Sequence, residues 1–170
     1  FKLLIITVGK KSLTPPIIRS VIWVLKSSVM GANIASLNPE PKPGFNTLSL
    51  LPVKRKFNKL DLEFNLEGEN SVCNIQSAAF LNENDHQEVK TRVNHLYPNC
   101  KSYQKVKNVL NDNSKGVYQG KIFVKDVAQK TDAYQLSKAV LLNEKSEFNS
   151  KPELEIYADD VKCSHGSTSG

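Results

Sequence analysis

The stretch Leu60-Asp61-Leu62-Glu63-Phe64-Asn65-Leu66 decides the class of fold, because apolar and polar residues alternate along its whole length. Successive side chains of a β-strand point to opposite faces, so the apolar residues share one face and the polar residues share the other. The next four residues, Glu67-Gly68-Glu69-Asn70, have the composition of a turn. The segment therefore predicts a half-buried strand that ends in a tight turn.

Similar strand patterns lie on both sides of this stretch. Residues 45–51 are typical of a strand that stops at Pro52, and Leu154 and Ile156 alternate with Glu155 and Tyr157. The run 121–124 is rich in β-forming residues and follows Gly116 and Gly120, which we interpret as turn glycines. Residues 17–29 and 89–97 are compatible with either a helix or a strand.

Many short strands and no sustained helix predict an all-β protein. Its 170 residues fit one domain, 1–170, and the hydrophobic fraction of 39% suits an elongated body with a narrow core. A sandwich and a solenoid both fit these signals, and no fixed-period repeat is visible to choose between them. The chain begins at Phe1 without a Met, and we expect it to be a fragment of a longer protein.

Charge and cysteine usage exclude several classes of function. The net charge is +6, but the lysines are spread along the chain without interleaved aromatic residues, so nucleic-acid binding is disfavoured. The apolar stretch 17–30 contains Arg19 and Lys26 and is too short to span a bilayer. Three widely spaced cysteines do not form a disulfide framework, and with no secretory signal we expect a cytoplasmic protein without a membrane partner.

The run Cys163-Ser164-His165 is the first candidate for chemistry. On a strand, Cys163 and His165 point to the same side, where a thiolate and an imidazole together suit iron or a related metal. A closed site needs about four ligands, so either a partner chain completes this one or there is no site. From the residues alone, a buried Cys beside a hydrogen-bonded His is the favoured interpretation.

Two further groups carry weaker signals. His95 and Cys100 match no zinc-binding spacing, and we interpret Pro98-Asn99 as a turn with Cys100 in the core. Asp159 and Asp160 would point to opposite faces of a strand, so a turn is the better interpretation for them. The sequence has no Walker-type loop, nucleophile elbow or zinc-protease motif.

Four segments together resemble one known family. They are Gly-Val-Tyr-Gln-Gly-Lys-Ile-Phe-Val at 116–124, Ala-Gln-Lys-Thr-Asp-Ala-Tyr-Gln at 128–135, Ala-Val-Leu-Leu at 139–142 and Lys-Pro-Glu-Leu-Glu-Ile-Tyr-Ala-Asp-Asp-Val-Lys-Cys-Ser-His-Gly at 151–166. The chain resembles the core of the SufB/SufD family of iron–sulfur cluster assembly scaffold proteins, and the last segment is similar to its SufD branch. The resemblance covers residues 45–170 well and residues 1–44 weakly; Pro15, Pro16 and Trp23 depart from it.

The resemblance implies a right-handed parallel β-helix without the terminal helical regions of the family. It implies a scaffold subunit, not an enzyme, that pairs with a SufB-like chain, while a SufC-like ATPase docks through a C-terminal region absent here. A nascent iron–sulfur cluster would be shared transiently with the partner, and this segment alone would hold none. His165, with Cys163 behind it, would serve cluster assembly and contribute metal ligands. Cys73, His95 and Cys100 would be structural.

Two alternatives remain at this stage. The first is a purely structural β-solenoid interaction module, in which Cys163 and His165 only pack. The second is a carbohydrate-active β-helix enzyme that uses Asp159 and Asp160, although no aromatic ladder or secretory signal supports it.

Overall fold

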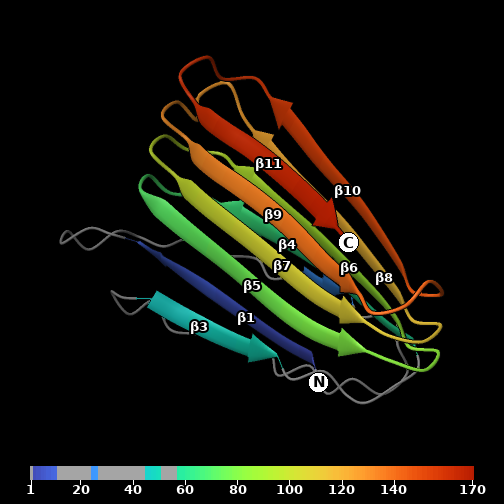
Figure 1. Ribbon diagram of the computed structural model, residues 1–170. Coiled ribbons are helices and arrows are strands. Elements are labelled where there is room, and N and C mark those ends of the chain that lie inside the picture. Colours follow the sequence, from blue (N-terminus) through green and yellow to red (C-terminus); the bar gives the residue numbers. More distant parts are fainter. Residues whose placement is uncertain (1, 11–23, 27–44, 51–56) are drawn as a thin grey trace.

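The protein is an all-β solenoid. The computed structural model describes the backbone of residues 2–10, 24–26, 45–50 and 57–170, and side chains from residue 57 onward (Figure 1). The described residues form eleven strands and no helix. None of these residues therefore belongs to a helix capable of crossing a lipid bilayer.

Two sheets face each other, and the chain passes from one to the other with each strand. The solenoid strands are β4 (Phe57–Leu66), β5 (Ser71–Leu81), β6 (His86–His95), β7 (Lys101–Leu110), β8 (Lys115–Val124), β9 (Asp132–Leu141), β10 (Glu147–Ile156) and β11 (Lys162–Ser169). Odd-numbered strands build sheet A, in the order β11-β9-β7-β5-β1-β3, and even-numbered strands build sheet B, in the order β10-β8-β6-β4-β2 (Figure 1). Each pair of strands with its two turns makes one coil.

The register gives the length of each coil. Phe57 pairs with His86 and His86 with Lys115, a spacing of 29 residues, whereas Lys115 pairs with Glu147, a spacing of 32. From β4 to β11 every pairing within a sheet is parallel. The predicted all-β parallel solenoid is thus confirmed over this range.

Three earlier strands extend the two sheets through antiparallel pairings. They are β1 (Lys2–Lys10), β2 (Val24–Lys26) and β3 (Phe45–Leu50). β1 pairs antiparallel with both β3 and β5, and β2 pairs antiparallel with β4. The strand predicted at 45–51 is confirmed as β3. Trp23, the proline-rich segments at 15–16 and 39–43, and most of the ambiguous stretch 17–29 lie outside the described residues.

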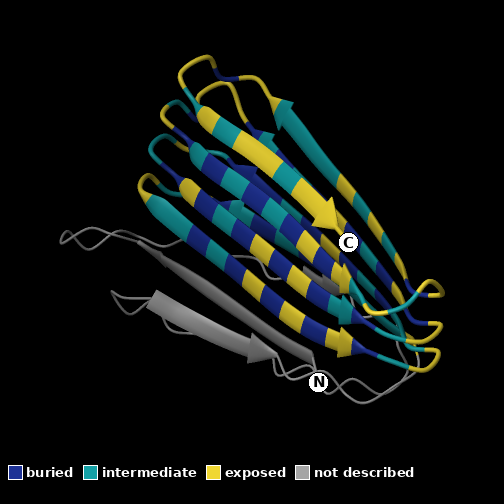
Figure 2. Cartoon of the chain, viewed as in Figure 1, coloured by how far each residue is buried: buried dark blue, intermediate teal, exposed yellow. Residues whose placement is uncertain are grey.

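The alternation in the sequence explains which side chains fill the interior. Leu62, Phe64 and Leu66 of β4 are at most 2% exposed, whereas the intervening polar residues face solvent. Figure 2 shows the same alternation as bands along β5, β7 and β9. Full burial of one such apolar side chain contributes about 1.5–3 kcal/mol, so this face selects the strand and its register. The ambiguous run at 89–97 is a strand, β6, up to residue 95.

The turns stack as regularly as the strands. Asn70, Asn99 and Lys130 occupy equivalent positions in successive coils, and each has a positive φ of 58–60°. Their backbone N–H groups donate to the next turn: Asn70 to Pro98 O at 3.3 Å and Asn99 to Gln129 O at 2.9 Å. Asn tolerates this left-handed backbone better than most residues, which is why Asn recurs at these corners. Backbone hydrogen bonds between successive turns thereby link each coil to the next.

The interpretation of Gly116 and Gly120 as turn glycines was wrong. Both lie inside β8 and face the interior. A Cβ atom on Gly116 would lie 3.0 Å from Cδ2 of Phe148, and one on Gly120 would overlap the Gln135 carboxamide and the Tyr118 hydroxyl. Glycine is needed at these positions because large neighbouring side chains occupy the space that a side chain would take.

Candidate functional site

Cys163 and His165 lie on β11, which is one of the two outermost described strands of sheet A. β11 pairs with β9, so that Cys163 stands beside Ala133 and His165 beside Gln135. Ala133 and Gln135 are each 1% exposed and point into the interior. Cys163 and His165 therefore belong to the inward-facing row of their strand, as the alternation predicts.

The exposure of His165 comes from its place at the end of a column. Ile75, Gln104 and Gln135 stand in register beneath it, and none of them is more than 1% exposed. His165 continues this column on the last strand, where no further coil in the described residues covers it, and it is exposed. A chain placed over β11 would bury the imidazole in the same way.

The Cys163 side chain is half-buried, whereas that of His165 is exposed. Cys163 packs against the apolar cluster that includes Val124, Ala133 and Ala158. Burial raises the pKa of its thiol; a backbone hydrogen bond with Ala133 opposes this shift and the negative charge of Asp132 adds to it. Cys163 is consequently a protonated thiol near neutral pH, and a metal that binds it displaces the proton.

The structure separates the other predicted residues from this pair. Cys73 lies in the same column as Cys163, with Ser102 and Ala133 between them. Three strand spacings of ~4.8 Å place the two cysteines about 14 Å apart, too far to share one metal. Among the described residues no three His, Cys, Asp or Glu side chains gather as a metal site. Cys163 and His165 therefore offer about half of a closed ligand set.

His95 and Cys100 are buried inside the second coil. His95 is 0% exposed, its Nε2 lies 2.9 Å from Ser102 Oγ, and its Nδ1 has no hydrogen-bond partner in the described part of the chain. Burial lowers the pKa of His95 to about 4, so the ring is neutral. The Cys100 thiol donates to the Gly68 carbonyl at 3.2 Å, beside the turn at Pro98 and Asn99. Burial is the main reason that its pKa is raised.

Asp159 and Asp160 lie in the bend between β10 and β11 and are exposed. The Asp160 carbonyl accepts from Lys130 N–H at 2.6 Å, and the Asp160 N–H donates to Gln129 Oε1 at 2.9 Å. The predicted turn is present, and its backbone groups continue the stack of corners.

Sequence reasoning missed a set of buried polar residues below the site. Thr91 Oγ1 donates to Gln104 Oε1 at 2.6 Å, and the Tyr118 hydroxyl lies 3.3 Å from the same oxygen. Gln104 Nε2 and Gln135 Oε1 are buried without partners in the described residues. The one signal in the sequence was spacing: Gln104 lies two positions before Val106, so on a strand both side chains point to the same, buried face.

Comparison with known proteins adds the family. Residues 48–170 match the model described as SUF system FeS cluster assembly, SufBD core domain. The chain belongs to the SufBD core domain family. The resemblance inferred from the sequence is thereby confirmed at the family level, and β3 to β11 of the fold fall almost entirely within the SufBD match.

Individual proteins match shorter parts of the chain. The iron–sulfur cluster assembly protein SufD of Escherichia coli is 41% identical over 105 residues, which are 62% of this chain and 25% of that protein. A SufBD family protein of Synechocystis is 42% identical over 72 residues, 42% of this chain and 16% of the relative. The chloroplastic protein ABCI7 of Arabidopsis thaliana is 45% identical over 58 residues, 34% of this chain and 12% of the relative. The chain thus spans a quarter or less of the length of these relatives.

Proposed function

We propose that this chain is part of a SufD-like scaffold subunit that supports the assembly of an iron–sulfur cluster at an interface with a SufB-like partner. The observation that carries the proposal is the position of Cys163 and His165 on the inward row of an edge strand, in a member of the SufBD family. The likeness to SufD of Escherichia coli supports the choice of the SufD branch.

The chemistry of the pair fits a nascent cluster as cargo. Thiolate and imidazole are both ligands that iron–sulfur centres use. Two ligands bind a metal weakly, so the partner chain supplies the others and the cluster leaves when the interface changes. The raised pKa of the Cys163 thiol keeps that residue protonated until iron arrives.

The edge strands provide the place for a partner. Among the described strands, β11 and β10 stand last in sheets A and B, and in this proposal the partner pairs with their outer backbone N–H and C=O groups. A partner that continues both sheets would cover His165 and exclude water from it. In this proposal a SufC-like ATPase supplies nucleotide hydrolysis from another part of the complex, and the scaffold itself turns over no substrate. A reducing cytoplasm keeps Cys163 as a thiol.

The test compares full-length variants co-expressed with the SufB-like and SufC-like partners. His165→Ala is expected to assemble the complex but to accumulate far less cluster, measured as iron and acid-labile sulfide per complex. Ser164→Ala is the matched control, because Ser164 is exposed on the outward row of the same strand. Normal cluster content in His165→Ala would refute the role of His165.

A purely structural role is the second candidate, and the packing of Cys163 against an apolar cluster favours it. In that case His165→Ala and Cys163→Ser would weaken the heterodimer and leave the cluster content per dimer unchanged. Analytical ultracentrifugation of the variants, read beside the iron assay, separates the two functions.

A further inference from the structure

The outer face of sheet A carries an unbalanced charge. Its outward rows on β5, β7, β9 and β11 hold five lysines and a single carboxylate. We call these residues the basic face: Lys101, Lys105, Lys107, Asp132, Lys138 and Lys162. Lys101 lies 3.8 Å from the Asp132 carboxylate, and the other four have no ion pair within the described residues.

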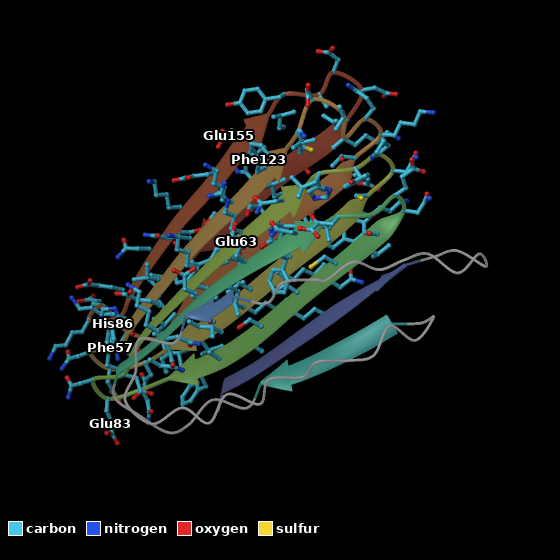
Figure 3. All side chains as sticks on the ribbon, turned by 180° about the vertical axis from the view of Figure 1, so that it is seen from behind. Phe57, Glu63, Glu83, His86, Phe123 and Glu155 are labelled. Carbon is cyan, nitrogen blue, oxygen red and sulfur yellow. The ribbon has the colours of Figure 1, made fainter. Side chains whose placement is uncertain are left out.

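Sheet B shows that this imbalance is not general to the solenoid. Five of the six outward cations on its described solenoid strands lie in ion pairs, as in Lys59–Glu88 at 3.0 Å, Lys115–Glu147 at 3.0 Å and Lys151–Glu153 at 2.8 Å. The sixth is Lys90. Figure 3, which views the molecule from behind, labels Glu63 and Glu155, two more carboxylates of sheet B that take part in ion pairs. The same fold thus neutralises one outer face and leaves the other positive.

The lysines of the basic face also repel each other. Lys107 and Lys138 stand directly opposite in the parallel pairing of β7 and β9, and both are exposed. Like charges in opposite positions on neighbouring strands destabilise a sheet. A bound negative group would relieve this repulsion as well as gain contacts of its own.

An apolar column runs beside these lysines. Val109 and Val140 are paired two positions further along β7 and β9, and Val140 is 49% exposed. Leu142, in the following turn, is 54% exposed. Aliphatic side chains next to unpaired lysines form a surface that is basic on one side and hydrophobic on the other.

These observations choose among possible occupants. A second copy of this face would bring lysines against lysines. Nucleic acid would need aromatic stacking platforms along the lysines, whereas the exposed column contains one aromatic residue, Phe80, which pairs with Val109 and is 40% exposed. The aromatic Tyr103 donates its hydroxyl to Asp132 at 2.8 Å, which places a carboxylate where a phosphate would lie. An acidic segment with aliphatic side chains along one edge satisfies both parts of the surface.

We infer that the outer face of sheet A, centred on Lys105, Lys107, Lys138 and Val140, docks an acidic amphipathic segment of a partner protein. This surface is separate from the inward row that carries Cys163 and His165. A partner could therefore occupy it while the edge strands are engaged.

The test measures binding of a fluorescein-labelled peptide of patterned Glu and Leu by fluorescence anisotropy. The triple variant Lys105→Glu, Lys107→Glu, Lys138→Glu is expected to weaken binding at least about tenfold, because three attractive charges become repulsive. The matched control Lys59→Glu, Lys115→Glu, Lys151→Glu changes the net charge equally on sheet B and is expected to stay within about twofold of the parent.

Val140→Ser tests the apolar column and is expected to weaken peptide binding about threefold or more, since one exposed Val loses its contact. Equal losses in both triple variants would overturn the inference, because they indicate binding by net charge alone. Tighter binding of single-stranded oligothymidylate than of the peptide would also overturn it, as would no peptide binding at low salt. None of these binding measurements depends on cluster assembly. They can therefore fail or succeed independently of the function proposed for His165.

Discussion

Lowering the pH should destabilise this solenoid through one buried imidazole. His95 is 0% exposed and makes one hydrogen bond, to Ser102, while its other ring nitrogen lacks a partner within the described residues. Burial lowers its pKa from 6.5 to about 4. The unfolded chain therefore binds a proton at a higher pH than the folded chain does, and protonation favours unfolding.

The magnitude follows from the size of the shift. At about 1.4 kcal/mol per pKa unit, neutral His95 contributes about 3 kcal/mol to the free energy of unfolding, and this contribution is fully present above pH 6.5. That contribution falls steadily as the pH decreases towards 4, and no more is lost below it. A loss of this size is a large part of the free energy of unfolding of an ordinary domain.

The assay is urea unfolding of the chain at a series of pH values between 7 and 4, followed by circular dichroism. The control variant His95→Gln keeps a hydrogen-bonding side chain for Ser102 but cannot titrate. The parent should lose about 3 kcal/mol more than the variant over this pH range, whatever the carboxylates contribute to both. Equal pH dependence in the two proteins would show that His95 is not held neutral by burial, and the reasoning would fail.

Two further predictions concern the interior and the thiols. Gly120→Ala should lower the free energy of unfolding by about 1–3 kcal/mol, because its Cβ would overlap the Gln135 carboxamide. Gly166→Ala should cost less in the same urea titration, because its Cβ would lie 3.3 Å from Leu136 Cδ1. Iodoacetamide should modify Cys163 first in the folded chain, since Cys73 is 0% exposed and burial raises its pKa to about 12. Peptide mapping by mass spectrometry reads the order, and modification of Cys73 as fast as Cys163 would contradict it.

The sequence predicted the strands better than it predicted the coils. The alternation at 60–66 identifies β4 because burial of Leu62, Phe64 and Leu66 favours only one face. The repeat was hidden in the turns, where Asn-Glu-Asn-Asp at 82–85, Asn-Asp-Asn-Ser at 111–114 and Asn-Glu-Lys-Ser at 143–146 follow one another. Cross-coil bonds such as Asn143 Nδ2 to Asn111 Oδ1 at 3.1 Å explain the repeated Asn.

Other features were beyond pattern reasoning for physical reasons. Gly116 and Gly120 look like turn residues because nothing local shows that Phe148 and Gln135 need their space. The inward polar residues Thr91 and Gln104 look like solvent-facing positions, since only the other sheet supplies their partners. The pattern placed Cys163 and His165 on one side of a strand correctly. The column in which Gln135 lies beneath His165 could not be predicted, because the register between coils is a property of the assembled sheet.

The change of interior along the solenoid axis has a consequence for dynamics. Ile75 of the first coil is fully buried, whereas the exposed His165 occupies the same column in the last. On sheet B, Leu60 of the first coil is replaced by Ser150 in the last. Because each coil is held only by its neighbours, amide protons of β10 and β11 should exchange with solvent earlier than those of β4 and β5. In this 170-residue chain, β11 is then more readily opened than β4 or β5. When a partner binds there, part of the binding free energy offsets the cost of ordering that strand. Assembly therefore determines how rigidly Cys163 and His165 are held.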